Sequence, residues 1–462
     1  MKNRSPWIHQ LRPDREITRL SEDRTTDCAI IGAGIAGVAT AFFTLKYTDK
    51  NVTLLEAFKL AHGATGHNAG QVTSYFERGF ASLSDEFGLK LAAEGQKSVE
   101  GAWELLDEMY TDAGLTLPFS RFEGHAGLST FDQVIFHLRN NHARRAAGLP
   151  VETFRIAETA PFLSSISHEY AGLFTVIPHA EVLSLLETQD ERFLATISYQ
   201  KGCLNSALFC EEVVLYLLKK YPERFAIFEH TPIGKVVLTE DKAVLDADSY
   251  TVTTEHAVLC TNGFDNIRVL TAEGLDVDTN LHHNIHGVVG YMSGYLEKMN
   301  KLPGAWSYLL PPNESDEFYR SDPNTGDPYF LITRRPYVYE EKAEHNLISV
   351  AGPEVALPDR RNYSRDTDYP EAITDEIDQF VKHTYDIEPN RKIDYLFTWH
   401  GLMGYTKNLV RLVGPEPTHP VLLYNLGCNG VGILPSVFGG RRIADYIAQR
   451  NVSPSIFDIP KK

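Results

Sequence analysis

The sequence is poor in the features that mark secreted, membrane and nucleic-acid-binding proteins. Its 462 residues include only five cysteines, mostly within apolar segments, which indicates reduced core residues and a cytoplasmic protein. No apolar run approaches the roughly 18 residues that span a bilayer, so we expect no integral membrane segment. Positive charge is also scarce, since the sequence has 44 Lys and Arg residues but 61 Asp and Glu residues. The net charge of −17 argues against a nucleic-acid partner.

Cysteine and histidine spacings typical of metal sites are missing as well. The nearest candidate is the group His282, His283 and His286, which lacks acidic or cysteine partners, so we expect no metal. Residues 1–26 have mixed charges and no apolar signal-peptide core, and predict a polar leader laid over the surface. At 462 residues the chain is too long for one simple core, so two intertwined domains are expected.

The most informative segment begins at residue 27. Residues 27–41 read Asp-Cys-Ala-Ile-Ile-Gly-Ala-Gly-Ile-Ala-Gly-Val-Ala-Thr-Ala, an apolar strand, a glycine-rich turn and the start of a helix. In such a turn Gly32 permits the tight bend, Gly34 lets a pyrophosphate approach the backbone, and Gly37 allows close helix–strand packing. The helix N-terminus offers N–H groups and partial positive charge to phosphates. The pattern predicts a dinucleotide site, with an empty Rossmann-like unit as the alternative.

An acidic residue completes this motif. Glu56 follows a second apolar strand, 24 residues after Gly32, and is placed to accept hydrogen bonds from an adenosine ribose. The motif fits FAD and NAD equally. The small residues crowded into 61–71 favour FAD, because they suggest a backbone pressed against a large planar ligand. The alternative for this segment is a glycine-rich surface loop.

A second glycine-rich turn near the C-terminus also favours FAD. Residues 421–433 read as a strand that runs into a turn, and a helix with Arg441, Arg442 and Ile443 follows. The N-terminus of that helix, near Gly430 and Gly432, would face the pyrimidine edge of a flavin. Its partial positive charge would stabilise an anionic reduced flavin.

Together these segments resemble the D-amino-acid oxidase, glycine oxidase and sarcosine oxidase family of FAD-dependent oxidoreductases, in its γ-glutamylputrescine oxidase-like branch. Residues 63–71 (Gly-Ala-Thr-Gly-His-Asn-Ala-Gly-Gln) are similar to the family's Gly-Ala-Ser-Gly-Arg-Asn-Gly-Gly-Gln. Residues 203–208 are similar to its I-N-P-A-x-L element, 260–263 to its A-T-G turn, and 399–414 to its W-x-G-x-x-x-x-T…I-G segment. The resemblance covers nearly the whole chain.

The resemblance implies a two-domain fold. An α/β Rossmann-type FAD-binding domain would comprise residues 27–115, 196–275 and 396–462. An interleaved α+β substrate-binding domain with an antiparallel sheet would comprise 116–195 and 276–395. Hydrophobic periodicity predicts helices over 84–112, 206–221 and 371–385, a strand meander over 224–261, and strands over 284–295, 329–334 and 346–352. The turn formers of 311–328 predict a loop.

The resemblance also implies the contacts of the cofactor. The expected FAD-binding residues are Gly32, Gly34, Ile35, Ala36, Gly37, Glu56, Ala57, Gly63, Ala64, Thr65, Gly66, His67, Asn68, Gly70, Gln71, Ile233, Thr261, Gly263, Gly404, Gly427, Asn429, Gly430, Val431, Gly432 and Ile433. Non-covalent binding is expected, because Met403 stands where the sarcosine-oxidase branch has its linking cysteine. A covalent link through His67 is the alternative, since the dimethylglycine-dehydrogenase branch links its flavin through a histidine in this segment.

In this family a C–H bond next to an amine nitrogen gives hydride to the flavin N5, and the resulting imine hydrolyses. The resemblance therefore implies a small-molecule amine substrate and O2 or another electron acceptor, with an oxidase favoured over a dehydrogenase. Two alternatives stay open. One is a dehydrogenase that passes electrons to a quinone or a protein, and the other is a flavin-holding scaffold without amine chemistry.

The substrate side of the site is less typical of the family. Leu331 stands where the branch has a carboxylate-binding arginine, and Leu434 where relatives have a lysine. A simple α-amino acid substrate is therefore in doubt unless Arg334, Arg335 or Lys407 supplies the missing charge. The candidate catalytic residues are Tyr405, Lys407, Tyr329 and Arg334, and the candidates for an aromatic lining are Tyr291, Tyr329 and Tyr337.

Overall fold

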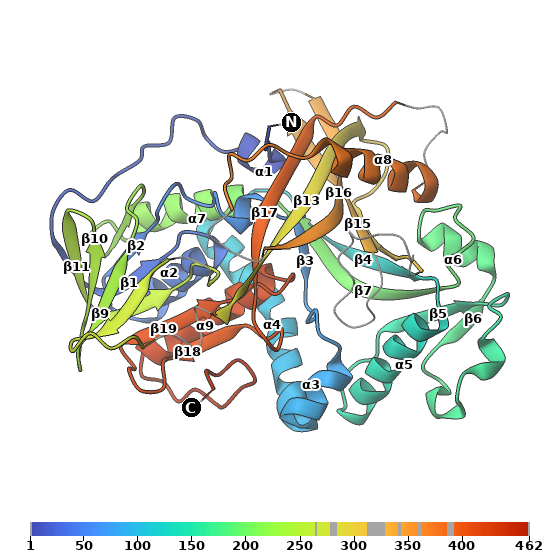
Figure 1. Cartoon of the computed structure of the whole chain (residues 1–462), viewed down its shortest axis with the longest axis horizontal. Helices are drawn as coiled ribbons and strands as arrows, with labels where there is room; N and C mark the ends of the chain where they lie inside the picture. Colours follow the sequence, from blue (N-terminus) through green and yellow to red (C-terminus); the bar gives the residue numbers. More distant parts are fainter. Residues whose placement is uncertain are drawn as a thin grey trace.

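The computed structural model of the chain describes residues 2–263, 266–277, 284–311, 329–340, 343–357, 363–385 and 392–460. In this part of the chain the strands form two mixed sheets, which lie side by side with helices packed on them (Figure 1). Segments far apart in the sequence alternate between the two halves. The predicted mixed α/β architecture is confirmed. His282, His283 and the predicted loop 311–328, apart from Pro311, lie outside the described residues.

The first sheet has the order β12-β9-β10-β11-β1-β2-β8, with β19 beside β11 and β18 beside β19. Its strands are β1 Arg24–Ile31, β2 Val52–Leu55, β8 Phe225–Phe228, β9 Lys235–Leu238, β10 Ala243–Ala247, β11 Tyr250–Leu259, β12 Arg268–Thr271, β18 Leu412–Pro415 and β19 Leu422–Leu426. The centre, from β8 through β2, β1 and β11 to β19, is parallel. Its strands are buried on both faces, as their continuous apolar runs predict.

Two differences from the predicted elements have clear physical reasons. The predicted meander ends in a long strand, β11, rather than a short one, because its first half pairs with β10 and its second half with β19. The helix expected over 84–112 is divided into α3 Phe80–Phe87 and α4 Leu89–Ala113. The break falls at Gly88, whose φ of 80° is not helical.

Helices cover the first sheet where the cofactor motif lies. They are α2 Ile35–Tyr47, α7 Ser206–Lys220 and α9 Ile433–Ile447. Residues 35–45 of α2 are all buried, because the sheet lies on one side and α9 on the other. Gly440 of α9 permits this packing, since an added Cβ would lie 2.7 Å from the Thr40 nitrogen.

The second sheet has the order β17-β13-β16-β15-β14-β4-β7-β5-β6, with β3 beside β7. Its strands are β3 Gln71–Thr73, β4 Phe119–Leu128, β5 Thr153–Ala157, β6 Thr175–Ile177, β7 Ala195–Leu204, β13 His286–Lys298, β14 Gly304–Leu309, β15 Tyr329–Tyr339, β16 Ala343–Leu357 and β17 Phe397–Tyr405. Most neighbours are antiparallel. Three further helices are α5 Phe131–Ala146, α6 His179–Leu185 and α8 Glu371–Thr384, and short 3-10 turns are η1 Ala64–Gly66, η2 Leu163–Ser165 and η3 His168–Tyr170.

The sheets do not follow the sequence-based domain boundaries everywhere. Strands β3, β7 and β17 pair within the second sheet, although the sequence analysis placed them in the FAD-binding domain. A residue can border a cofactor from either sheet, so the expected proximity of these motifs to a cofactor stays a prediction. Pairing of strands, rather than motif content, decides which sheet a segment joins.

The start of the N-terminal segment enters the core, while residues 9–25, apart from Leu20, are exposed or half-buried. Helix α1 Pro6–His9 inserts Trp7 into the core, where the indole is fully buried and packs edge-on against Trp399, with ring centroids 6.2 Å apart. The Ser5 hydroxyl caps α1 by accepting from the Trp7 N–H and donates to the Gly66 carbonyl. The polar composition of residues 1–26 did not indicate this buried tryptophan, whose large apolar ring packs into the core despite its polar neighbours.

The described helices include none that is long and apolar enough to cross a membrane. The five cysteines are all free thiols, four of them buried and Cys428 half-buried. No group of three or more potential metal ligands occurs among the described residues.

Candidate active site

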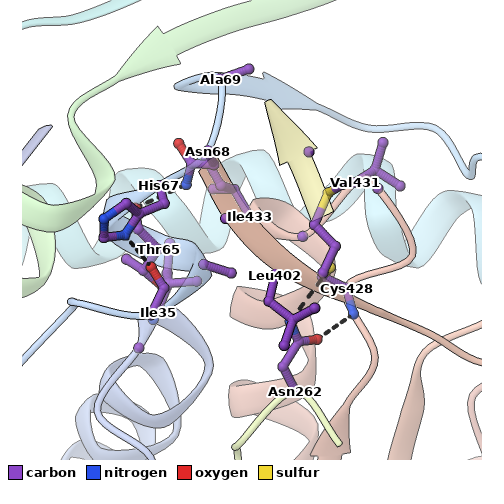
Figure 2. A pocket seen from close by; sticks show the side chains of 18 of the residues that line it. Ile35, Thr65, His67, Asn68, Ala69, Asn262, Leu402, Cys428, Val431 and Ile433 are labelled. Carbon is purple, nitrogen blue, oxygen red and sulfur yellow. Dashed lines mark hydrogen bonds between the residues drawn. The ribbon is translucent and has the colours of Figure 1, made fainter. Parts of the chain in front are cut away.

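A cavity of about 1370 Å³ lies between the two sheets. Its walls come from the β1–α2 turn, the loop 56–69, one face of the second sheet, and the turn 428–433. Figure 2 shows Thr65, His67 and Asn68 on one side of this space, and Asn262, Cys428 and Val431 on the other. The fold therefore joins the N-terminal and C-terminal glycine motifs in one site.

The first glycine motif has the geometry that its sequence predicts. Gly32 has a φ of 105°, and an added Cβ would lie 2.7 Å from the Cys260 carbonyl oxygen. A Cβ on Gly34 would lie 2.9 Å from the Thr65 hydroxyl, and one on Gly37 would overlap the Gly32 carbonyl oxygen. The tight turn, the open backbone and the close helix contact each require glycine at its position.

Two helix N-termini open into the cavity. Helix α2 begins after Gly34 and α9 after Gly432, and as N-caps these glycines carry no side chain to satisfy the first N–H groups. The Ile35 N–H donates to the Thr65 hydroxyl at 2.9 Å. Both ends bring partial positive charge to the cavity, which suits a phosphate at α2 and an electron-rich ring edge at α9.

Other polar groups along the cavity also fit a dinucleotide. The Glu56 carboxylate is half-buried and accepts from the N–H groups of Ala33 at 2.8 Å and Phe58 at 2.9 Å, which fixes its position for a ribose. The Thr261 hydroxyl is buried, lines the cavity, and has no hydrogen-bond partner in the described part of the chain. A buried polar atom of this kind calls for a partner, which FAD would supply. The residues present therefore fit FAD.

His67 projects from the loop after η1. Its Nδ1 lies 3.0 Å from the Gly63 carbonyl oxygen, to which it donates when the ring is neutral. Burial lowers the pKa of His67 to about 4, so the imidazole is neutral at physiological pH. Gly401 of β17 allows the loop to approach, because an added Cβ would lie 2.6 Å from the His67 carbonyl oxygen.

Most of the predicted cofactor residues line the cavity. They are Gly32, Gly34, Ile35, Ala36, Glu56, Ala57, Gly63, Ala64, Thr65, His67, Asn68, Gln71, Ile233, Thr261, Gly430, Val431, Gly432 and Ile433. The others lie behind its wall, and these are Gly37, Gly66, Gly70, Gly263, Gly404, Gly427 and Asn429. This second group shapes the wall. Asn429, for example, accepts from the Thr406 N–H at 2.8 Å and so fixes the end of β17.

The four predicted catalytic residues do not lie together. Tyr329 lines the cavity, and its hydroxyl donates to Glu354 at 3.1 Å. Tyr405 is buried behind Gly430, where an added Cβ would lie 2.9 Å from its hydroxyl. Lys407 is exposed beyond the end of β17. Arg334 lies on the opposite face of β15 and forms a bidentate ion pair with Glu187 at 2.6 and 2.7 Å.

These positions do not support a catalytic role for Arg334 or Lys407. Arg334 is committed to a buried ion pair, and the Glu187 carboxylate raises its pKa further above that of a free guanidinium. Arg335 is buried farther along the strand, 4.8 Å above the ring of Trp7. None of the three cations that the sequence offered in place of the missing arginine reaches the cavity beside Leu331.

Several residues near the cavity have no signal in the sequence. The N-terminal segment contributes Asn3, Arg4, Ser5, Ile8 and His9 to the cavity wall. Asn262 joins the turns after β11 and β19, because its Oδ1 accepts from the Cys428 N–H at 2.9 Å. The Lys201 ammonium group lies behind Gln71 and Ser307, two residues that line the cavity. No spacing in the sequence signals these contacts, since each depends on which strands become neighbours.

Comparisons with known proteins agree with this geometry. A family model described as FAD dependent oxidoreductase (DAO) matches residues 27–446. The crystal structure of glycine oxidase from Geobacillus kaustophilus is similar with a TM-score of 0.67 at 16% identity, covering 95% of this chain and 99% of that chain. L-proline dehydrogenase from P. horikoshii follows with 0.61 at 14%, covering 93% and 94%.

A further similar structure contains the cofactor. L-α-glycerophosphate oxidase from Mycoplasma pneumoniae, solved with FAD bound, has a TM-score of 0.60 at 12% identity, covering 95% of this chain and 100% of that chain. A search of curated proteins with the sequence finds no match. At these identities the solved structures show the fold, and their differing substrates leave the substrate of this chain open.

Proposed function

The chain belongs to the DAO family of FAD-dependent oxidoreductases, and on that premise we propose that it oxidises a C–N bond of a small amine or amino-acid-like substrate. One observation carries the proposal. The cavity bordered by the glycine-rich turn at Gly32 and Gly34 continues to the face of the second sheet, where Gln71, Ser307 and Tyr329 line it. A substrate on that face would meet the cofactor within the same cavity.

When bound, FAD supplies the acceptor for the hydride equivalent of a C–H bond beside nitrogen. The chain's own residues supply orientation. The Tyr329 hydroxyl and the Glu354 carboxylate form a polar pair on the sheet face that can receive an amine N–H group. Leu331, Leu402 and Met403 provide apolar walls that exclude water from the reacting bond. The Gln71 amide is held in place, because it donates to the Thr333 hydroxyl at 2.8 Å.

We expect the purified yellow protein to bleach under anaerobic conditions when a suitable amine is added. A panel of amines and amino acids at millimolar concentration, followed by flavin absorbance, tests this. Return of the yellow colour with peroxide on admitting air would support O2 as the acceptor, which we favour. Slow reoxidation in air but rapid reoxidation by a quinone would instead support a dehydrogenase. Bleaching by dithionite but by no amine would contradict the proposed function.

We also expect the FAD to be non-covalent. Met403 offers no thiol at the position of the family's linking cysteine, and the His67 ring is already oriented by the Gly63 carbonyl. Precipitation of the holoprotein with acid should therefore leave the yellow colour in the supernatant. A yellow pellet would contradict this prediction. A colourless pellet from His67→Ala under the same treatment would then identify His67 as the linked residue.

A further inference from the structure

Lys201 is a buried lysine at the centre of the second sheet. Its side chain is 1% exposed, and it lies on β7 two residues after Tyr199, on the sheet face that lines the cavity. The aliphatic stem crosses the neighbouring strand β4 over Gly124, where an added Cβ would lie 2.6 Å from the Lys201 Cδ. Because Gly124 leaves this space, the ammonium group reaches β14, 3.4 Å from the Ser307 hydroxyl.

The partners of this ammonium group are neutral. It donates to Oε1 of the Gln71 side chain at 3.3 Å and lies 5.9 Å from the centre of the Tyr75 ring. No carboxylate of the described residues lies within ion-pair distance of it. Burial lowers the pKa of Lys201 to about 8, with Glu77 as the acid that partly opposes the shift. A buried cation without a counterion is costly unless a ligand provides one.

The ammonium group lies near position 331, where the sequence has leucine in place of the expected carboxylate-binding arginine. Ser307 pairs in register with Leu331, the residue that replaces the arginine of the resembled branch. Gln71, Tyr75 and Ser307 all line the cavity. A cation therefore lies beside position 331, although it comes from β7 rather than from β15.

We propose that Lys201 binds the carboxylate of the substrate and so replaces the arginine that the resembled branch has at position 331. The substrate would then be an amine that carries a carboxylate. This inference rests on the proposed amine oxidation and names its substrate class. Gln71 and Ser307 would share the carboxylate oxygens with Lys201, while the Tyr329 and Glu354 pair receives the amine.

The test compares matched acids and amides on the holoenzyme. Glycine and glycinamide, and 4-aminobutyrate and its amide, differ only in the charge that Lys201 would bind. We expect the wild type to be reduced more efficiently by the acid of at least one pair. Lys201→Met keeps the volume but removes the charge, and should lower that efficiency about 30- to 100-fold for the acid with little change for the amide. Lys201→Arg should restore part of the preference, and Lys219→Met, at an exposed position on α7, serves as the control.

A binding measurement separates this proposal from the proposed function. Butyrate and butyramide, which lack an amine, can be titrated into the holoprotein and followed by the flavin difference spectrum. Butyrate should bind more tightly, and its Kd should rise about tenfold per pH unit above pH 8, as the ammonium group loses its proton. Glu77, His125 and Tyr75 are the titratable groups that act on it, and Lys201→Met should abolish the pH dependence.

Two outcomes would overturn the role of Lys201. One is equal binding of butyrate and butyramide by the wild type, and the other is an unchanged butyrate Kd in Lys201→Met. Either can be observed whether or not any amine bleaches the flavin. Failure of every amine to bleach the flavin, with butyrate binding intact, would instead count against the proposed reaction alone.

Discussion

Gly34→Leu should abolish FAD binding while the apoprotein stays folded. The backbone at Gly34 has φ −80° and ψ −176°, a conformation that leucine adopts without strain. The new side chain would start 2.9 Å from the Thr65 hydroxyl and fill the space in front of the α2 N-terminus. A pyrophosphate could then not reach the backbone N–H groups. We expect the affinity for FAD to fall at least about 1000-fold, equivalent to ~4 kcal/mol.

The measurement is the chromophore released by heat from equal amounts of purified protein, identified by mass spectrometry. The wild type should release FAD rather than FMN, and Gly34→Leu should release no flavin. Gly101→Leu is the matched control, because Gly101 is exposed on α4 with no atom near its added Cβ. Circular dichroism should show the same fold for both variants. A yellow Gly34→Leu protein would refute the phosphate position.

The cofactor half of the site was accessible from the sequence because its signals are local. The turn at Gly32, the helix start at Gly34 and the acid at Glu56 follow each other along one βαβ unit, so spacing alone placed them. The second turn, near Gly430, was likewise read from a strand that ends in glycines. In the structure both turns border the same cavity. Local backbone chemistry therefore predicted both turns before any tertiary contact was known, while their contacts with FAD stay a prediction.

The substrate half could not be predicted in the same way, since it depends on register between strands. Arg334 and Arg335 follow Leu331 by three and four residues in the sequence, yet the alternation of β15 turns Arg334 to the opposite face. Lys201 is 130 residues from Leu331 in the sequence, but its ammonium group lies beside Ser307, the strand partner of Leu331. Only β4 lies between β7 and β14, and Gly124 of β4 leaves room for the lysine side chain. No single-sequence pattern specifies that neighbourhood.

The burial of Trp7 at the start of the N-terminal segment could not be predicted for a related reason. Trp7 was one aromatic residue within a polar stretch, and periodicity gave it no partner. In the structure its indole N–H donates to the Asn68 carbonyl, which also accepts from Trp399. Gly70 lies against the same ring, because an added Cβ would lie 2.9 Å from it. Trp7 therefore supports the loop that carries His67 and Asn68 into the cavity.

Trp7→Ala should accordingly weaken FAD binding as well as the fold. Loss of a fully buried tryptophan typically costs about 3–5 kcal/mol of unfolding free energy. It would also leave the Arg335 guanidinium, now 4.8 Å above the ring, over an empty space. Because the loop 63–71 would lose its support on the side away from the cofactor, we expect the Kd for FAD to rise about 10- to 100-fold, or ~1.4–2.8 kcal/mol. Reconstitution of the apoprotein with FAD, followed by flavin fluorescence below the melting temperature, measures this change.

Trp306→Ala provides a closely matched control. Trp306 is 4% exposed, its indole N–H donates to the Leu185 carbonyl at 3.1 Å, and the Arg334 guanidinium lies 4.7 Å above its ring. It differs from Trp7 in packing on the opposite face of the second sheet, away from the cofactor loop. Trp306→Ala should therefore lower the unfolding temperature to a similar extent without changing the Kd for FAD. If both variants lost FAD equally, general destabilisation would explain the loss. If Trp7→Ala bound FAD as the wild type does, the loop 63–71 would not depend on the N-terminal segment for its position.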